Sequence, residues 1–163
     1  MKTQVVTLIV RMVGLPLFLT AFSLPAASTT ETGPASGPVA GWVCALVAGA
    51  TTAGIPHLLT TAPAPDKKLL SGLFLVLSGW VNPLLLIYFG FTLAPRFVRL
   101  RRGLAVAILA CLCASWAFFA MGPMYPLVGH YVWVAGILML LAPEAVALFG
   151  PSSSQDGPSS PNQ

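Results

Sequence analysis

The stretch SGWVNPLLLIYFG, residues 78–90, places an Asn-Pro pair inside one of the most apolar parts of the chain. If a helix began here, Asn82 would be its N-cap and Pro83 its first residue, a favourable pairing. Only residues 83–94 would then precede Pro95. At roughly 1.5 Å per residue they reach about 18 Å, which is too short to cross a bilayer. We therefore interpret Pro83 as a kink near the centre of a single span, residues 69–94.

The side chain of Asn82 needs a partner in that position. An unpaired polar group in hydrocarbon costs several kcal/mol, so we expect Asn82 to form a hydrogen bond to a neighbouring helix. The alternative is a polar lining at a broken helix, as in transporters, which would make the protein a transport component.

The composition is that of an integral membrane protein. Of the 163 residues, 56% are hydrophobic and only 7% are charged, with a mean hydropathy of +0.86. Soluble domains have about a quarter charged residues, so this chain has too few to cover a water-facing surface. Half of its eight basic residues lie in RFVRLRR, residues 96–102. These four arginines, Arg96, Arg99, Arg101 and Arg102, are interpreted as a topology signal and lipid head-group anchor rather than a nucleic-acid site.

Five apolar segments are visible, at residues 5–27, 38–62, 69–94, 103–122 and 127–150. If all five crossed the membrane, the basic clusters at 66–68 and 96–102 would lie on opposite sides, against the positive-inside tendency. Four spans avoid this conflict, with residues 38–62 interfacial or re-entrant. The predicted fold is thus an all-α integral membrane bundle of about four transmembrane helices plus that segment, in the bacterial inner membrane with both termini cytoplasmic.

The predicted organisation follows from this topology. Residues 1–27 form the first transmembrane helix, or alternatively a secretory signal peptide ending near PAAS. Residues 28–68 lie outside the cytoplasm and contain the helix at 38–62, residues 69–150 form a three-helix transmembrane core, and the Pro/Ser-rich residues 151–163 form a disordered tail.

Two charges fall within predicted spans. Arg11 and Glu144 each lie about 9 Å from the cytoplasmic end of their helices, and equal depth on one side predicts an ion pair that fixes helix packing. Independent snorkelling to the head groups and a proton relay are the alternatives.

The two histidines suggest a different kind of site. His57 and His130 both face the outer side in the four-span topology, where they could hold haem or another tetrapyrrole axially. His130 beside Tyr131 and Trp133 is also typical of an interfacial aromatic belt. Met121 and Met124 near His130 are more typical of packing than of a soft-metal site, so no metal site is predicted.

The sequence has none of the H-E-x-x-H, G-x-S-x-G or G-x-x-x-x-G-K motifs, and its three cysteines make no recognisable framework. The prediction is a small non-enzymatic multi-pass protein, a structural or accessory subunit that contacts the lipid bilayer and other membrane subunits but no nucleic acid. Tetrapyrrole binding and transport remain the alternatives.

The segments GWVCALVAG, WVNPLLL, RFVRLRR and GHYVWVAG, in this order, resemble a family of small multi-pass bacterial inner-membrane proteins with the pattern GW…WxNPL…RR…GxYxW. The resemblance covers most of the chain after Pro38. It implies a four-span inner-membrane protein and no particular activity. His130 stands where that family more often has an aromatic residue, which argues against transferring a histidine-based function.

Overall fold

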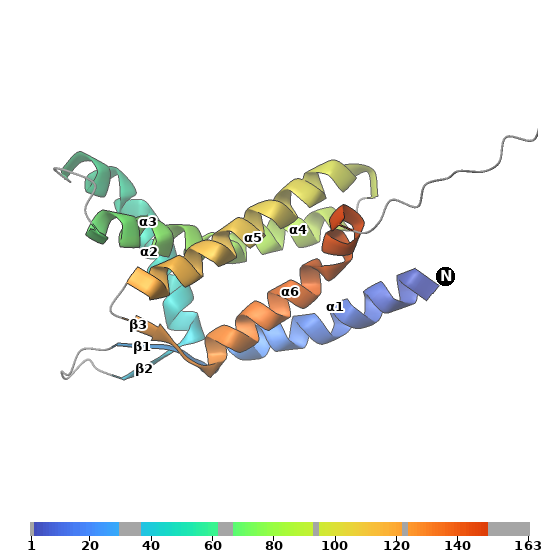
Figure 1. The fold of residues 1–163 in the computed structure, drawn as a ribbon, viewed down its shortest axis with the longest axis horizontal. Helices are drawn as coiled ribbons and strands as arrows, with labels where there is room; N and C mark the ends of the chain where they lie inside the picture. The colour runs from blue at the N-terminus through green and yellow to red at the C-terminus, as the bar shows by residue number, and fades with distance from the viewer. Residues whose placement is uncertain (1, 30–36, 62–66, 93–94, 122–123, 150–163) are drawn as a thin grey trace, which may run out of the picture.

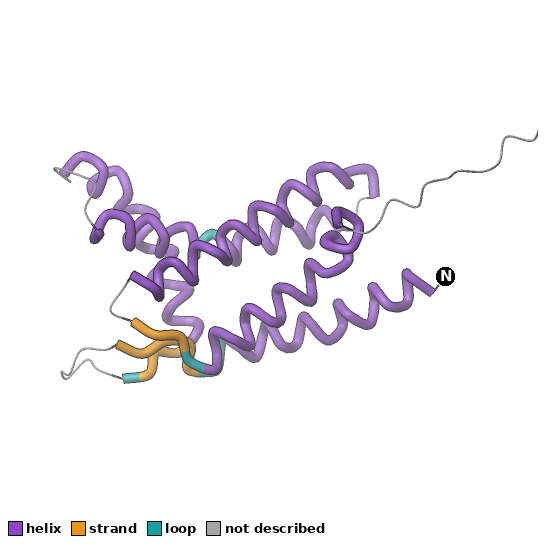
Figure 2. Tube along the Cα trace, in the orientation of Figure 1, coloured by secondary structure: helices purple, strands orange, loops and turns teal. Residues whose placement is uncertain are grey.

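The computed structural model describes residues 2–29, 37–61, 67–92, 95–121 and 124–149. The chain in these ranges is mostly helical, as predicted, with one small sheet (Figures 1 and 2). The elements are α1 (Lys2–Ala21), β1 (Pro25–Thr29), β2 (Pro38–Ala40), α2 (Gly41–Thr61), α3 (Lys67–Gly79), α4 (Val81–Thr92), the 3-10 turn η1 (Pro95–Phe97), α5 (Val98–Met121), β3 (Met124–Pro126) and α6 (Val128–Phe149). The predicted tail, residues 151–163, lies outside the described residues.

Three helical stretches in the described ranges are long and apolar enough to cross a membrane. They are Leu69–Thr92, which joins α3 and α4, Val98–Met121 in α5, and Val128–Val146 in α6. Shorter apolar stretches occur in α1, at Leu8–Ala21, and in α2, at Gly41–Thr52. Helices of this length and composition are those of a membrane protein.

All helices except α2 run roughly along one long direction, whereas α2 rises across it from the sheet (Figure 1). α1 packs beside α6 and α5 beside α3 and α4. The first turn of α1, the turn η1 and the end of α6 all lie toward one end of the molecule, whereas the sheet lies at the other. α2 starts beside the sheet, packs mainly on α3 and stays in the sheet half.

The Asn-Pro pair lies just after a mild interruption in one long helix. Only Trp80 separates α3 from α4, and its amide still donates to the carbonyl of Val76 at 3.2 Å. Asn82 and Pro83 are therefore the second and third residues of α4. Because proline has no amide to donate, the carbonyl of Gly79 loses the partner that Pro83 would supply, which accounts for a break at this point.

The arginine-rich segment, which lies between the apolar segments 69–94 and 103–122, is largely helical. α5 begins at Val98, so Arg99, Arg101 and Arg102 belong to its first two turns. Cations near a helix N-terminus are unfavourable for the helix dipole, and the inward-facing contacts of Arg101 described below offset that cost.

The sheet was not predicted from the sequence. β1 pairs antiparallel with both β2 and β3, in the order β2-β1-β3, with Ser28 opposite Pro38 and Tyr125. Its strands are only three to five residues long. They join the end of α1, the start of α2 and the start of α6, so the sheet holds these three helices together at one end of the bundle.

α1 and α6 approach each other closely through two glycines. A Cβ atom added to Gly136 would lie 2.7 Å from the backbone nitrogen of Phe18, and one added to Gly14 would lie 3.1 Å from the carbonyl oxygen of Gly136. Small residues at such crossings let helix backbones pack tightly in a membrane. The adjoining buried cluster includes Phe18, Leu85 and Ile137 and extends across α4 and α5.

We predict that Gly136→Ala destabilises the protein while Gly90→Ala does not. A Cβ at Gly136 meets backbone atoms that cannot yield, and overpacking of this kind costs about 1–3 kcal/mol. Gly90 in α4 has nothing within 4 Å of a built Cβ, so its replacement should stabilise the helix by up to about 1 kcal/mol. Thermal unfolding in detergent measures both. Equal unfolding temperatures would contradict the close crossing.

Candidate functional site

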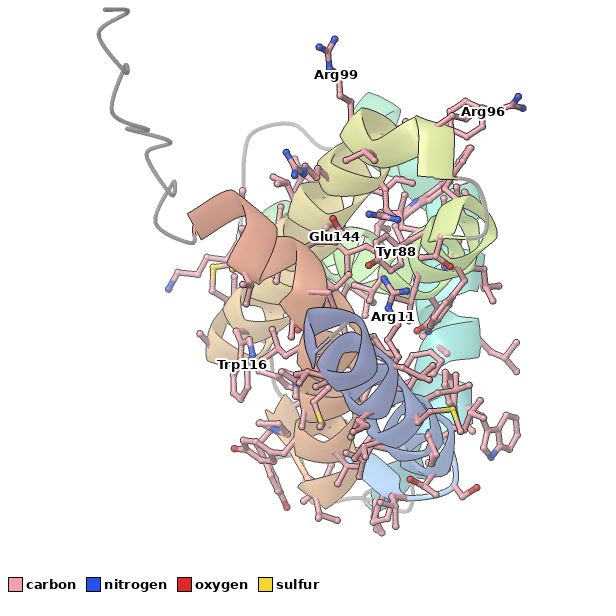
Figure 3. The ribbon with its side chains drawn as sticks, turned by 90° about the vertical axis from the view of Figure 1, so that its right-hand side faces the viewer. Arg11, Tyr88, Arg96, Arg99, Trp116 and Glu144 are labelled. Atoms are coloured by element: carbon pink, nitrogen blue, oxygen red, sulfur yellow. The ribbon has the colours of Figure 1, made fainter. Side chains whose placement is uncertain are left out.

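A cluster of polar side chains joins four helices near the η1 end of the bundle. Glu144 of α6 lies 2.7 Å from Arg101 Nε of α5 and 3.9 Å from Arg11 of α1. Arg11 also makes a long hydrogen bond, 3.5 Å, to the hydroxyl of Tyr88 in α4. Figure 3 shows Arg11, Tyr88 and Glu144 pointing toward one another between the helices. The sequence predicted that Arg11 and Glu144 lie at equal depth, and the structure places them within ion-pair distance.

The carboxylate at the centre of this cluster is buried. Glu144 is 3% exposed and Tyr88 0%, whereas the side chains of Arg11 and Arg101 are 27% and 20% exposed. Although Arg101 Nε is close to the carboxylate, its N–H is not aligned for a hydrogen bond, so the contact is ionic rather than directional. The two guanidinium groups place positive charge next to the buried carboxylate of Glu144.

Sequence analysis missed the roles of Arg101 and Tyr88. Arg101 had been grouped with its neighbours as a lipid anchor, but it points inward. Its place near the start of α5 puts it at the same end of the bundle as Glu144, which is the signal that could have identified it. Tyr88 carries no comparable signal, because one tyrosine among apolar residues is ordinary in a span.

The remaining arginines differ from Arg101. Arg96 and Arg99 are exposed and point away from the bundle in Figure 3. The guanidinium carbon of Arg96 lies 4.8 Å from the ring centre of Phe97. Arg102 is half-buried, and its Nε has no partner among the described residues. Arg96 and Arg99 are thus the arginines of this segment whose side chains are exposed.

Asn82 is bonded to another helix. Its Oδ1 accepts a hydrogen bond of 3.2 Å from the indole nitrogen of Trp133 in α6. The bond ties the start of α4 to α6. This hydrogen bond gives the Asn82 side chain the partner on a neighbouring helix that was expected from the sequence.

A cavity of about 330 Å³ lies in the sheet half of the bundle. All six helices and all three strands contribute residues to its walls. Asn82, His130 and Trp133 are among them. His130 is buried, with its ring centre 4.7 Å from that of Phe119 and 5.5 Å from that of Trp133. His57 belongs to α2, but its side chain lies outside the described part of the structure, so the pairing of the two histidines is not tested.

The described residues contain no group of three or more His, Cys, Asp or Glu side chains able to hold a metal ion. The three cysteines are free thiols, and of these Cys111 is buried in the core and Cys44 lies in the cavity wall. Comparison with protein-family models, curated proteins and solved structures gave no match to this chain.

We predict that Arg101→Gln destabilises the protein and that Arg99→Gln, from the same helical turn, does not. Removing one partner of a buried ion pair costs about 3–5 kcal/mol. We expect about 3 kcal/mol here, because Arg101 is partly exposed and Arg11 remains near Glu144. Arg99 is exposed, and its loss should stay within about 0.5 kcal/mol. Unfolding in a graded denaturing detergent, followed by circular dichroism, compares the two; a similar loss in both would contradict the structural role of the cluster.

Proposed function

We propose that this chain is a multi-pass inner-membrane protein in which α1, α3 with α4, α5 and α6 cross the bilayer and α2 does not. The shared end of α1, η1 and α6 supports this arrangement, because it puts the start of α1, the basic segment and the end of α6 on one side, which the positive-inside tendency makes the cytoplasm. Packing of α1 on α6 supports retention of residues 1–27 as a transmembrane helix rather than a cleaved signal peptide.

Cysteine labelling in intact cells tests this topology. In a variant without the native cysteines, a membrane-impermeant maleimide should label Ser23→Cys and Lys67→Cys from outside, and Arg99→Cys only after permeabilisation. Ser23 and Lys67 flank β1, β2 and α2, so labelling of Lys67→Cys only after permeabilisation would mean that α2 crosses the membrane.

The proposed role is that of a non-enzymatic structural or accessory subunit of a membrane complex. The observation that carries it is the polar cluster around Glu144: its four side chains come from four helices and contact one another. Charged residues inside membranes often mark ion or substrate paths. In this protein Arg11, Arg101 and Glu144 connect three helices to one another instead, and such connections suit a rigid scaffold.

The outward face of α2 is where we expect a partner subunit. Trp42, Leu46 and Gly49 are exposed on it, and a Cβ added to Gly49 would meet nothing within 4 Å. A glycine inside a helix costs about 1 kcal/mol relative to alanine, and in the described part of the chain no close packing explains it. An apolar helix of another subunit could approach closely there.

Site-specific photocrosslinking tests the partner. A photoreactive residue at Leu46 should give one discrete adduct with a different membrane protein, whereas the same residue at Leu86, an equally apolar and 72% exposed position on α4, should give none. An adduct of twice the mass of the chain would indicate self-association and contradict the accessory role. Equal, diffuse labelling at both positions would indicate lipid contact alone.

The alternatives have less support. A transport path lined by Asn82 is less favoured because its carbonyl oxygen already accepts a hydrogen bond from Trp133 of another helix. Axial tetrapyrrole binding requires both His57 and His130, and of the two only the side chain of His130 is described; the absorption spectrum of the purified protein decides it. We also propose membership of the family of small bacterial inner-membrane proteins that the sequence resembles, on the motifs alone.

A further inference from the structure

The cavity in the sheet half of the bundle has the character of a ligand site. Its volume of about 330 Å³ falls within the usual range for small-molecule pockets, roughly 300–1,000 Å³. Its walls are mostly apolar, and none of the residues that line it carries a formal charge with His130 neutral. A few polar groups within apolar walls are what such pockets use to orient a ligand. An uncharged, largely apolar molecule would suit these walls.

The unpaired side chain of His130 is a second, independent indication of a ligand site. The residue is only 6% exposed, it lines the cavity, and its Nε2 atom is buried without a hydrogen-bond partner among the described residues. Buried polar atoms nearly always have a hydrogen-bond partner. The unpaired Nε2 atom of His130 therefore indicates a position where a ligand can supply that partner. A neutral imidazole has one N–H donor, and the tautomer protonated at Nε2 places that donor on the unpaired atom.

Asn82 provides a second donor in the same wall. Its Oδ1 is already occupied by the indole N–H of Trp133, so the group that the side chain can still offer is its NH₂. His130 and Asn82 both neighbour Trp133. The wall can thus present two neutral donors, and a ligand that uses both must carry acceptor atoms such as carbonyl oxygens.

The aromatic walls indicate the shape of that ligand. Phe22, Phe118, Phe119 and Trp133 line the cavity, and aromatic side chains pack well against flat rings. We propose that this cavity binds the ring of a neutral quinone, whose carbonyl oxygens accept hydrogen bonds from His130 and Asn82. A single or fused double ring matches the volume better than a four-ring tetrapyrrole. This inference does not depend on the partner proposed for α2.

Equilibrium binding of decylubiquinone to the full chain in phosphatidylcholine nanodiscs tests the proposal. We expect saturable binding of one molecule per chain above that of empty nanodiscs. His130→Leu and Asn82→Leu should each weaken binding at least tenfold, and Ala45→Phe, which fills the cavity from α2, should abolish it. Tyr131→Phe is the matched control: Tyr131 follows His130 on α6 but is 52% exposed and does not line the cavity, so binding should be unchanged.

Two further measurements keep the proposal testable if a variant fails to fold. Dodecylbenzene has a ring and a tail but no carbonyl, and it should bind at least tenfold more weakly than decylubiquinone. In protein labelled with ¹⁵N-histidine and carrying His57→Gln, the quinone should shift the ring nitrogen resonances of His130. The proposal is overturned if no saturable binding occurs, if dodecylbenzene binds equally well, which would indicate a site for acyl chains only, or if the His130 resonances do not move.

Discussion

A buried carboxylate that cannot be left unpaired is the constraint on which this bundle depends. Glu144 is almost fully buried near the end of α6, and taking an isolated carboxylate out of water costs many kcal/mol. Arg101 and Arg11 offset that cost from two other helices. Because each guanidinium has to reach the same point, the depth and rotation of α1, α5 and α6 relative to one another are restricted, and Tyr88 extends the restriction to α4 through Arg11.

The two ends of the bundle are held by different means. At the η1 end the helices are joined by charge, whereas at the opposite end three short strands join α1, α2 and α6 through backbone hydrogen bonds. Between them the close crossing of Gly14 and Gly136 brings α1 against α6. The apolar cavity lies on the sheet side of this arrangement, where the helices are joined through the backbone.

The sequence predicted what depends on chain length, charge and hydropathy. The long apolar segments identified the helices. The equal depth of Arg11 and Glu144 in their predicted spans suggested that the two residues form an ion pair. It did not predict features that depend on tertiary contacts. The strands are short and contain Pro25, Pro38 and Pro126, so no alternating pattern of side chains marks them. Arg101 was not separated from Arg99, because only the rotation of α5 makes one face Glu144 and the other face outward. The cavity around His130 arises from residues spread from Ala21 to Trp133, a convergence that no local pattern reveals.

The pairing of α1 with α6 has a consequence for biogenesis. Among the described helices α1 is made before the others, whereas α6, which covers its glycine face and carries the carboxylate near Arg11, is made after them. At about 5–20 residues per second, Arg11 waits on the order of ten seconds before Glu144 is synthesised. During that interval the glycine face of α1 and the guanidinium of Arg11 lack the partners on α6 that they have in the folded bundle.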